Sequence, residues 1–216
     1  MKKISIFGAG GLGREVKEMI EQINTESQTW DFIGFWDDDD SLNKTINDSP
    51  LLGGINELNN YSDGELYLVC AVGDPNIKEK IISEIDNSVI KFPILIHPSA
   101  FIGNKKYVNI GEGTIITAGV IITVNIEIGK HVILNLSCTV GHDTKIGDNC
   151  SFMPSVNISG EVNIEKNVYV GTGAKIINQL KIGKNTTVGA GAVVAGSLPE
   201  NCTAVGVPAK PIKFKN

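Results

Sequence analysis

The stretch Ile133–Phe152, ILNLSCTVGHDTKIGDNCSF, has a large apolar residue at every sixth position, beginning at Leu134. The same stretch contains His142 with Asp143 beside it. An α-helix repeats about every 3.6 residues and a flat strand every two residues, so neither element explains the spacing. The stretch therefore indicates a structure whose unit is six residues long.

The six-residue spacing continues without a break through the carboxyl-terminal half of the chain. Such a repeat is typical of a parallel β-helix in which three hexapeptides form one coil and the apolar residue points to the axis. Glycine follows many of the apolar residues, and we expect these glycines to turn the corners with positive φ. The apolar positions are Ile110, Ile116, Ile122, Ile128, Leu134, Val140, Ile146, Phe152, Ile158, Ile164, Val170, Ile176, Ile182, Val188 and Val194, and the glycines are Gly111, Gly129, Gly141, Gly147, Gly171, Gly183 and Gly189. Together with an earlier hexad displaced by two residues at Ile102–Gly103, they predict five to six coils.

The amino-terminal half follows a different pattern, in which strand-like and helix-like segments alternate. This alternation predicts a parallel sheet. About 95 residues make half of a dinucleotide-binding fold, so we expect an α/β domain over residues 1–97 and the β-helix with a tail over residues 98–216. The expected strands are Lys3–Phe7, Phe32–Trp36, Leu66–Val72 and Val89–Ile96, and the expected helices are Gly13–Ile23 and Ile77–Ile85.

Composition excludes several classes of protein. The 216 residues carry a net charge of -5 and give a pI near 5.2, which argues against nucleic acid as a partner. No apolar run reaches the roughly 18 to 20 residues of a membrane-spanning helix, and the start lacks the features of a signal peptide. Four cysteines without a CxxC pair predict buried free thiols and no metal site. We expect a cytoplasmic protein.

His142 has neighbours that suit acyl transfer. In a coil of eighteen residues it lies directly beneath Gly160 and above Val124. Asp143 can hold one ring nitrogen and leave the other free to accept a proton, while the backbone N–H of Gly160 can stabilise an oxyanion. The alternative is a solvated histidine at a turn. His97 and His131 lack this setting, and His97 is expected to end the linker or to touch the substrate cleft.

A glycine-rich turn joins the first predicted strand to the first predicted helix. The stretch GAGGLG (Gly8–Gly13) satisfies GxGxxG through Gly8, Gly10 and Gly13, with Gly11 as a further glycine, and Asp37 lies about twenty-four residues further on. The motif is found in NAD-binding folds, but a half-fold lacks the second mononucleotide site. We therefore expect the turn and helix N-terminus to bind phosphate. An NAD-dependent enzyme remains an alternative, as does a solvated acidic turn for Asp37 and Asp38.

The whole chain resembles the bacterial nucleotide-sugar acetyltransferases and the related sialic acid O-acetyltransferases. The segments that carry the resemblance are FGAGGLGREV (Phe7–Val16), FWDDD (Phe35–Asp39), AVGDPNIKEKI (Ala71–Ile81), IHPSA (Ile96–Ala100), ILNLSCTVGHD (Ile133–Asp143) and VGVPAK (Val205–Lys210). The resemblance implies a left-handed β-helix, which sequence period alone would not predict. It also implies that His142 is the general base, that Asp143 orients it, that Asn135 lies in the same site, and that the Gly160 N–H faces the thioester carbonyl.

The same resemblance implies where the substrates bind. Acetyl-CoA is the co-substrate, and its arm would lie between neighbouring subunits of a homotrimer. For the nucleotide sugar the implied residues are Gly8, Gly10, Gly11, Gly13, Asp37, Asp38 and Gly73, and for acetyl-CoA they are Gly160, Ala174, Gly189, Val207, Pro208 and Lys210. Two departures leave the acceptor open, because Leu12 and Ser151 stand where the family often has histidines.

These observations predict an acetyl-CoA-dependent N-acetyltransferase acting on a nucleotide-linked amino sugar, a precursor of cell-surface polysaccharide. The base would also serve an O-acetyltransferase that acts on sialic acid or another sugar hydroxyl. A β-helix that binds nucleotide sugar without turnover is the non-enzymatic alternative.

Overall fold

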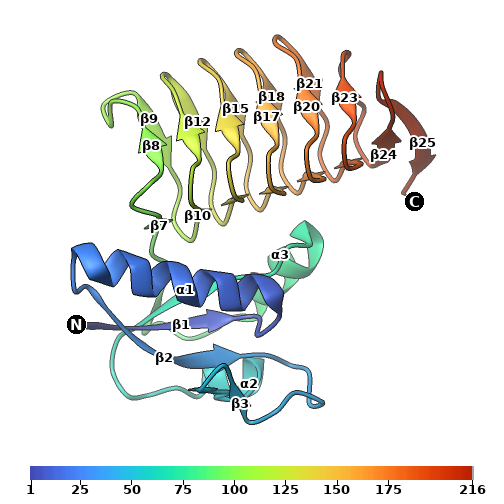
Figure 1. Cartoon of the computed structure of the whole chain (residues 1–216). Helices are drawn as coiled ribbons and strands as arrows, with labels where there is room; N and C mark the ends of the chain where they lie inside the picture. Colours follow the sequence, from blue (N-terminus) through green and yellow to red (C-terminus); the bar gives the residue numbers. More distant parts are fainter. Residues whose placement is uncertain (216) are drawn as a thin grey trace.

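The computed structural model describes residues 1–215 and shows a small α/β domain beneath a long β-helix (Figure 1). The domain holds one parallel sheet in the order β2-β1-β5-β6, as the alternating segments predict. A short helix and a two-stranded hairpin in the connection after β2 were not predicted. The elements are β1 (Lys2–Phe7), α1 (Gly11–Glu26), β2 (Trp30–Trp36), β3 (Thr45–Ile46), β4 (Ser49–Pro50), α2 (Ile55–Asn59), β5 (Leu66–Cys70), α3 (Pro75–Glu84) and β6 (Ile90–Lys91).

The prediction of one strand over Val89–Ile96 is wrong. Ile90–Lys91 pairs with β5 in the amino-terminal sheet, whereas Leu95–Ile96 (β7) pairs with the β-helix strand β10. The chain therefore passes from one sheet to the other across residues 92–94, a segment that includes Pro93, which cannot donate a ladder hydrogen bond. The apolar run concealed this break.

The β-helix has three flat faces, which we number in chain order. Face 1 contains β7 (Leu95–Ile96), β10 (Ile115–Ile116), β13 (Ile133–Leu134), β16 (Ser151–Phe152), β19 (Tyr169–Val170), β22 (Thr187–Val188), β24 (Cys202–Val205) and β25 (Lys210–Phe214). Face 2 contains β8 (Phe101–Ile102), β11 (Ile121–Ile122), β14 (Thr139–Val140), β17 (Asn157–Ile158), β20 (Lys175–Ile176) and β23 (Val193–Val194). Face 3 contains β9 (Val108–Ile110), β12 (Ile126–Ile128), β15 (Lys145–Ile146), β18 (Asn163–Ile164) and β21 (Lys181–Ile182).

The coils stack in the register that the hexads predict. Leu134 pairs with Ile116 below it and Phe152 above it, eighteen residues apart in each direction. The first hexad is displaced as expected, since Ile102 pairs with Ile122 across twenty residues. The apolar positions point inward and form one continuous core. Cys138 and Cys150 lie in this core as free thiols, as predicted.

The glycines after the apolar residues do not take the positive φ that we expected of them. Positive φ occurs two residues later, at every sixth residue from Gly113 to Gly191. Most of these positions are Asn, Ser, Asp or Gly, and Asn and Asp are the side chains that tolerate this conformation best. The glycines serve a different purpose, because a Cβ on Gly141 would lie 2.6 Å from the carbonyl carbon of Ser159 in the next coil.

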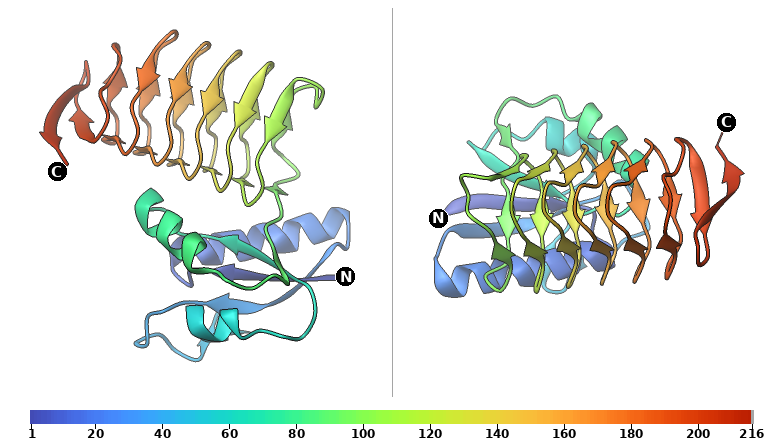
Figure 2. Two further views of the ribbon diagram at one scale, coloured as in Figure 1. Left: turned by 180° about the vertical axis from the view of Figure 1, so that it is seen from behind. Right: turned by 90° about the horizontal axis from the view of Figure 1, so that it is seen from above.

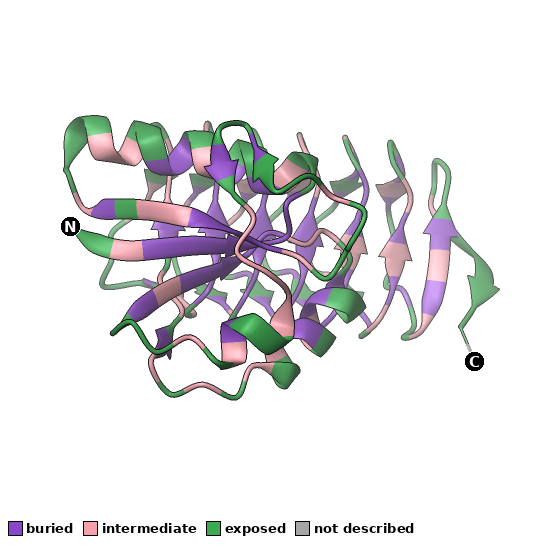
Figure 3. Ribbon diagram, turned by 90° about the horizontal axis from the view of Figure 1, so that it is seen from below, coloured by how far each residue is buried: buried purple, intermediate pink, exposed green. Residues whose placement is uncertain are grey.

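Face 1 rests on the amino-terminal domain. Its outward side chains Leu95, Ile115 and Ile133 share a hydrophobic core with β1 and α1. Figures 1 and 2 show α1 between the sheet and the coils, with α3 beside it. Viewed from below, the central strands of the sheet are buried (Figure 3). The edge between faces 2 and 3 therefore lies on the side of the β-helix away from this domain.

Candidate active site

His142 lies on the edge between faces 2 and 3, in the corner that follows β14. Its side chain is 57% exposed, and its Nδ1 lies 2.8 Å from Oδ2 of Asp143. Asn125, one coil below, donates from Nδ2 to the other Asp143 oxygen at 3.0 Å. The imidazole is thus held from one side, and its Nε2 has no hydrogen-bond partner among residues 1–215.

Asp143 is held in its role by the shape of the corner. It occupies the left-handed position, with φ at 58°. Its hydrogen bond with His142, and then that with Asn125, lower the pKa of the carboxyl group. An ionised Asp143 accepts from Nδ1–H, which leaves Nε2 as the ring atom able to take up a proton.

Gly160 lies directly over the His142 ring, as the register predicts. A Cβ at this position would lie 2.5 Å from both Cε1 and Nε2 of the ring, so only glycine fits. The next residue, Glu161, donates its N–H to the His142 carbonyl at 2.7 Å. The Gly160 N–H donates to no protein acceptor within residues 1–215. An imidazole nitrogen and a free backbone donor therefore lie side by side.

Asn135 lies elsewhere in the chain. It follows β13 on the edge between faces 1 and 2, is only 6% exposed, and accepts from the N–H of Leu136 at 2.7 Å. It lines a cleft of about 230 Å³ against α1. The cleft is lined by Glu15, Glu18, Met19, Gln22, His97, Thr117, Ala118, Asn135 and Leu136. A single chain does not bring Asn135 next to His142.

The other two histidines have structural surroundings. His97 bonds Gln22 of α1 through Nε2, and its Nδ1 accepts from the Ser99 N–H at 3.0 Å, so it ties the linker to α1 while lining the cleft. His131 is buried edge-on against Phe92, and burial lowers the pKa of its imidazole to about 4. Neither has the Asp143-type partner of His142.

The glycine-rich turn folds as its motif predicts. Gly8 takes a positive φ of 102° and lies against Ala71 and Val72, while Gly10 caps α1 without a side chain. Gly13 lies so close to the Gly8 carbonyl that no Cβ fits there. Gly11 opens the helix with no side chain to shield its N–H. The turn leaves backbone donors facing outward at a helix N-terminus, which suits an anion.

Asp37 and Asp38 lie at the end of β2, beside this turn. One Asp37 oxygen accepts from the Ala9 N–H at 2.8 Å, and Asp38 accepts from the Ile55 N–H at 2.7 Å at the start of α2. Both carboxylates thus support loops as well as lining a cleft of about 250 Å³. Gly8 and Val72 line the same cleft.

Gly73 follows Val72 and lines a neighbouring groove of about 440 Å³ between α3 and face 1. The other lining residues are Asp74, Pro75, Asn76, Met153, Asn167, Tyr169, Thr187 and Lys215. Because Val72 lines the first cleft and Gly73 the second, the loop after β5 contributes to both hollows.

The residues expected to bind acetyl-CoA fall into separate groups. Gly189 touches Val205 near the exposed turn that holds Val207, Pro208 and Lys210, at the end of the β-helix. Gly160 lies on the other edge, over His142. Ala174 is instead enclosed in the core at 0% exposure, so its side chain cannot contact acetyl-CoA.

Neither a metal cluster nor a membrane span is found. Within residues 1–215, no three His, Cys, Asp or Glu side chains are grouped to hold a metal ion. Over the same residues, no helix is both long and apolar enough to cross a bilayer.

Sequence reasoning missed Lys78. This side chain of α3 is fully buried between the two domains, where its Nζ donates to Ser151 Oγ at 2.9 Å. The signal was present, because the buried positions of α3 are Pro75, Lys78 and Ile81, three residues apart. A lysine on the apolar side of a predicted helix indicates that its side chain is buried.

The fold is that of the acyltransferases of the hexapeptide β-helix class. Residues 3–85 match the PglD N-terminal domain family, and residues 161–196 match the bacterial transferase hexapeptide (six repeats) family.

Solved structures resemble the chain over nearly its whole length. PerB from Caulobacter crescentus, crystallised with CoA and GDP-perosamine, is 30% identical over 99% of this chain and 98% of its own, with a TM-score of 0.86. The acetyltransferase domain of PglB from Neisseria gonorrhoeae FA1090, in complex with acetyl coenzyme A, is 30% identical over 98% and 99%, with a TM-score of 0.86. WeeI from Acinetobacter baumannii AYE is 30% identical over 98% and 100%, with a TM-score of 0.87. The chain belongs to this family of sugar N-acetyltransferases with a left-handed β-helix and a PglD-type amino-terminal domain.

Proposed function

We propose that the protein transfers the acetyl group of acetyl-CoA to the amine of a nucleotide-linked amino sugar. The observation that carries this proposal is the exposed His142 imidazole, held by Asp143 and covered by Gly160. Related structures hold the two substrate types, since PerB was crystallised with CoA and GDP-perosamine. We place the reaction in the cytoplasm, as a step toward a cell-surface polysaccharide.

The reaction needs no covalent enzyme intermediate. The amine nitrogen attacks the thioester carbonyl as His142 Nε2 takes its proton. The negative charge that develops on the carbonyl oxygen is stabilised by the Gly160 N–H. The C–S bond then breaks, and the departing thiolate is protonated by the imidazolium. Asp143 holds the ring orientation throughout, and base catalysis of this kind supplies about 10²–10⁴-fold.

One chain cannot bring acceptor and base together. The cleft lined by Gly8, Asp37 and Asp38, in which we place the nucleotide and which we call the nucleotide cleft, lies in the domain beneath face 1. His142 lies on the opposite edge of the closed β-helix core. A face of six residues at about 3.3 Å each is at most ~20 Å wide, so His142 lies on the order of 15 Å from face 1. An acceptor held by the amino-terminal domain must therefore meet His142 of a partner subunit.

The exposed apolar side chains support a trimer built around face 2. In the coils from β8 to β23 they all lie on face 2 or on its two edges, and they are Phe101, Tyr107, Ile121, Val124, Leu136 and Ile177. Face 1 exposes Val205, Ile212 and Phe214 as well, but only on β24 and β25 at its carboxyl-terminal end. Apolar side chains gathered on one surface mark an interface. If face 2 of each chain turns to a common axis, the edge that carries Asn135 meets the edge that carries His142 of the partner subunit.

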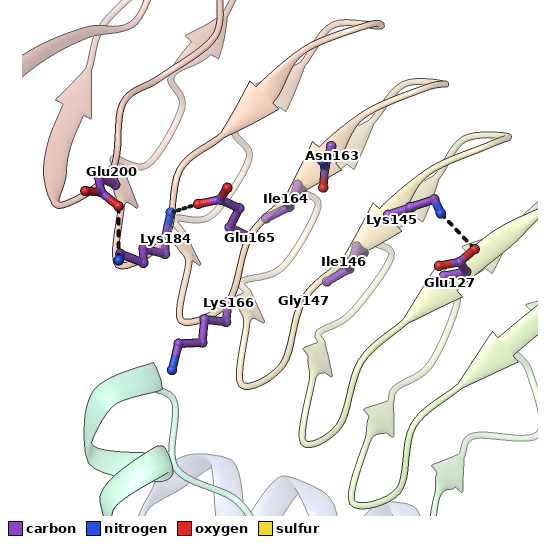
Figure 4. A pocket seen from close by; sticks show the side chains of 10 residues that line it. All are labelled: Glu127, Lys145, Ile146, Gly147, Asn163, Ile164, Glu165, Lys166, Lys184 and Glu200. Atoms are coloured by element: carbon purple, nitrogen blue, oxygen red, sulfur yellow. Dashed lines mark hydrogen bonds and ion pairs between the residues drawn. The ribbon is translucent and has the colours of Figure 1, made fainter.

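Face 3 has the opposite character. Residues of this face line a hollow of about 620 Å³. Among them Lys145 pairs with Glu127 at 3.0 Å and Lys184 with Glu200 at 3.2 Å (Figure 4). Exposed ion pairs add little stability, but they keep this face hydrated. In the proposed assembly face 3 is therefore exposed to solvent, and the subunits contact one another through face 2.

The proposed function is tested by thiol release. Purified protein would be incubated with acetyl-CoA and a panel of UDP-, GDP- and dTDP-linked amino sugars, with free sialic acids as hydroxyl acceptors. We expect thiol production with at least one nucleotide amino sugar. Thiol release with sialic acids alone would show that the acceptor is a sugar hydroxyl and not an amine. Nucleotide-sugar binding without any thiol release would show a non-catalytic binding protein.

A further inference from the structure

The junction between the domains contains a buried cation. Lys78 is 0% exposed, and its Nζ donates to Ser151 Oγ at 2.9 Å and to the Cys150 carbonyl at 3.4 Å. No carboxylate of the described residues forms an ion pair with it, although Glu79 beside it pairs with Lys166. Burying an unpaired ammonium costs several kcal/mol, so its position calls for an explanation.

Four titratable groups lie around Lys78. They are Cys70 from β5, Cys150 and His131 from the β-helix, and Asp74 from the start of α3 itself. Burial raises the pKa of both thiols to about 12 and lowers that of His131 to about 4. The thiols and the imidazole are therefore neutral at pH 7, while burial lowers the pKa of Lys78 only to about 8. Lys78 remains the cation of the junction at pH 7.

The end of β5 relates Lys78 to the glycine-rich turn. The Lys78 ammonium is near enough to Cys70, the last residue of β5, to interact with it electrostatically, and the next two residues, Ala71 and Val72, lie against Gly8. The ammonium thus lies behind the strand end on which the turn rests. It is enclosed in protein, where its field is screened less than that of a surface lysine.

The surface of the nucleotide cleft has the wrong charge for a nucleotide sugar. Its lining carries Asp37, Asp38 and Glu84 against the single cation Lys80. A sugar linked to a nucleoside diphosphate brings two further negative charges. Backbone donors at the start of α1 supply part of the compensation, and a buried positive charge would supply more.

We propose that Lys78 is a positioning residue for the acceptor, whose buried ammonium supplies positive potential behind the turn that binds the diphosphate of the nucleotide sugar. The inference rests on the proposed function for the identity of that acceptor. Lys78 does not touch the ligand, so it acts through space and leaves the acetyl-CoA side unaffected.

Replacement of Lys78 by methionine tests the charge while filling the same space. With UDP, GDP and dTDP as probes, we expect the diphosphate that binds best to wild type to bind Lys78→Met about tenfold more weakly, because the variant lacks one enclosed positive charge. The matching nucleoside, which lacks phosphate, should bind both proteins equally. The acceptor KM should rise while the acetyl-CoA KM stays constant.

Two control variants separate charge from structure. Lys166→Met removes an exposed cation of the same junction, which Figure 4 shows reaching toward α3, and should leave diphosphate affinity unchanged. Ser151→Ala removes a hydrogen bond to Lys78 but keeps its charge, and should also bind diphosphate normally. A variant that loses nucleoside and diphosphate affinity together would indicate distortion of the cleft and overturn the proposal.

Wild-type protein provides a test that does not depend on a variant folding. Diphosphate affinity should fall by up to about tenfold between pH 7 and 9 as Lys78 loses its proton, and by more than the affinity of the matching nucleoside, whose base is the same. Constant diphosphate affinity over this range, or no binding of any of the three diphosphates, would overturn the proposal. Because these assays need no turnover, normal diphosphate binding without thiol release would reject only the proposed enzymatic function.

Discussion

At the scale of single residues, the corner at His142 depends on three local properties. Asp143 tolerates the left-handed conformation, Gly160 leaves room for the ring, and Asn125 holds the second carboxylate oxygen. The eighteen-residue register predicts only that Gly160 lies over His142, and the structure has them there, because coils of constant length place residues in columns. The left-handed conformation of Asp143 and its contact with Asn125 were not predicted.

We expect His142→Ala to lower kcat by at least about a hundredfold, since the variant lacks the proton acceptor. The half-exposed side chain supports no core, so the melting temperature should stay within a few degrees of wild type. Steady-state thiol release and a thermal melt would measure both. Asp143→Asn, which keeps the shape but reverses the hydrogen bond to the ring, should lose less than His142→Ala. Near-normal turnover of His142→Ala would remove His142 from its role.

At the scale of elements, the hexapeptide rule was correct about positions and partly wrong about reasons. Aliphatic residues fill the core as predicted, but the glycines after them serve close stacking of coils and not positive φ. Periodicity reports which way a side chain points. It does not report how near the next coil lies, and that distance decides whether a Cβ fits.

Gly147→Ala tests the stacking role. The new Cβ would lie 2.6 Å from the backbone nitrogen of Lys166, and backbone atoms in a stacked coil cannot move aside cheaply. We expect the free energy of unfolding to fall by about 1–3 kcal/mol, measured by denaturant unfolding. Gly196→Ala, whose Cβ would meet nothing within 4 Å, is the matched control and should stay within ~0.5 kcal/mol. Equal stability of the two variants would contradict this account.

At the scale of the whole molecule, the two domains and the two edges of face 2 distribute the candidate residues. Asn135 and the carboxyl-terminal turn lie by one edge, while His142 and Gly160 lie on the other. The resemblance placed all of them in one site. A single chain separates them, which is why the assembly proposed above is needed for the chemistry.

A charge on face 2 should break that assembly. We expect Ile121→Asp to yield monomers that retain the β-helix fold but lose acetyl transfer, because Ile121 is 43% exposed on face 2. Analytical ultracentrifugation and thiol release would measure the two effects. Lys145→Asp on face 3 should remain assembled and active, and an active Ile121→Asp monomer would contradict a site shared between subunits.

Mixed assemblies provide a second test of the shared site. Gly8→Val should disable acceptor binding, since Gly8 has a φ of 102° and its Cβ would meet Val72. Each of His142→Ala and Gly8→Val should be inactive alone, whereas refolding them together should restore measurable turnover. A mixture that stays inactive would indicate that the base and the acceptor-binding domain act within the same chain.

The domain junction also predicts a dependence of stability on pH. Burial lowers the pKa of Lys78 from 10.5 to about 8, so between these values the unfolded chain binds more protons than the folded protein. Lys78 alone therefore adds about 3 kcal/mol to the free energy of unfolding as the pH rises from 8 to 10.5. The buried thiols, whose raised pKa values act in the opposite direction above pH 9, are present in wild type and in Lys78→Met alike. The difference in stability between the two proteins should therefore shift by this amount in favour of wild type, from a pH 7 value at which Lys78→Met is at least as stable. Urea unfolding of both proteins across that range is the measurement, and parallel pH profiles would contradict it.

Much of this protein can be read from residues close together in the chain. The three-sided coil, its register, the parallel sheet, the glycine-rich turn and the pairing of His142 with Gly160 all follow from short periods and motifs, because a constant repeat turns spacing into position. The break at residues 92–94, the burial of Lys78 beneath Ser151 and the separation of Asn135 from His142 do not follow. These features depend on which face of the β-helix packs against the amino-terminal domain, and that choice is made by side chains far apart in sequence whose contacts no local pattern encodes.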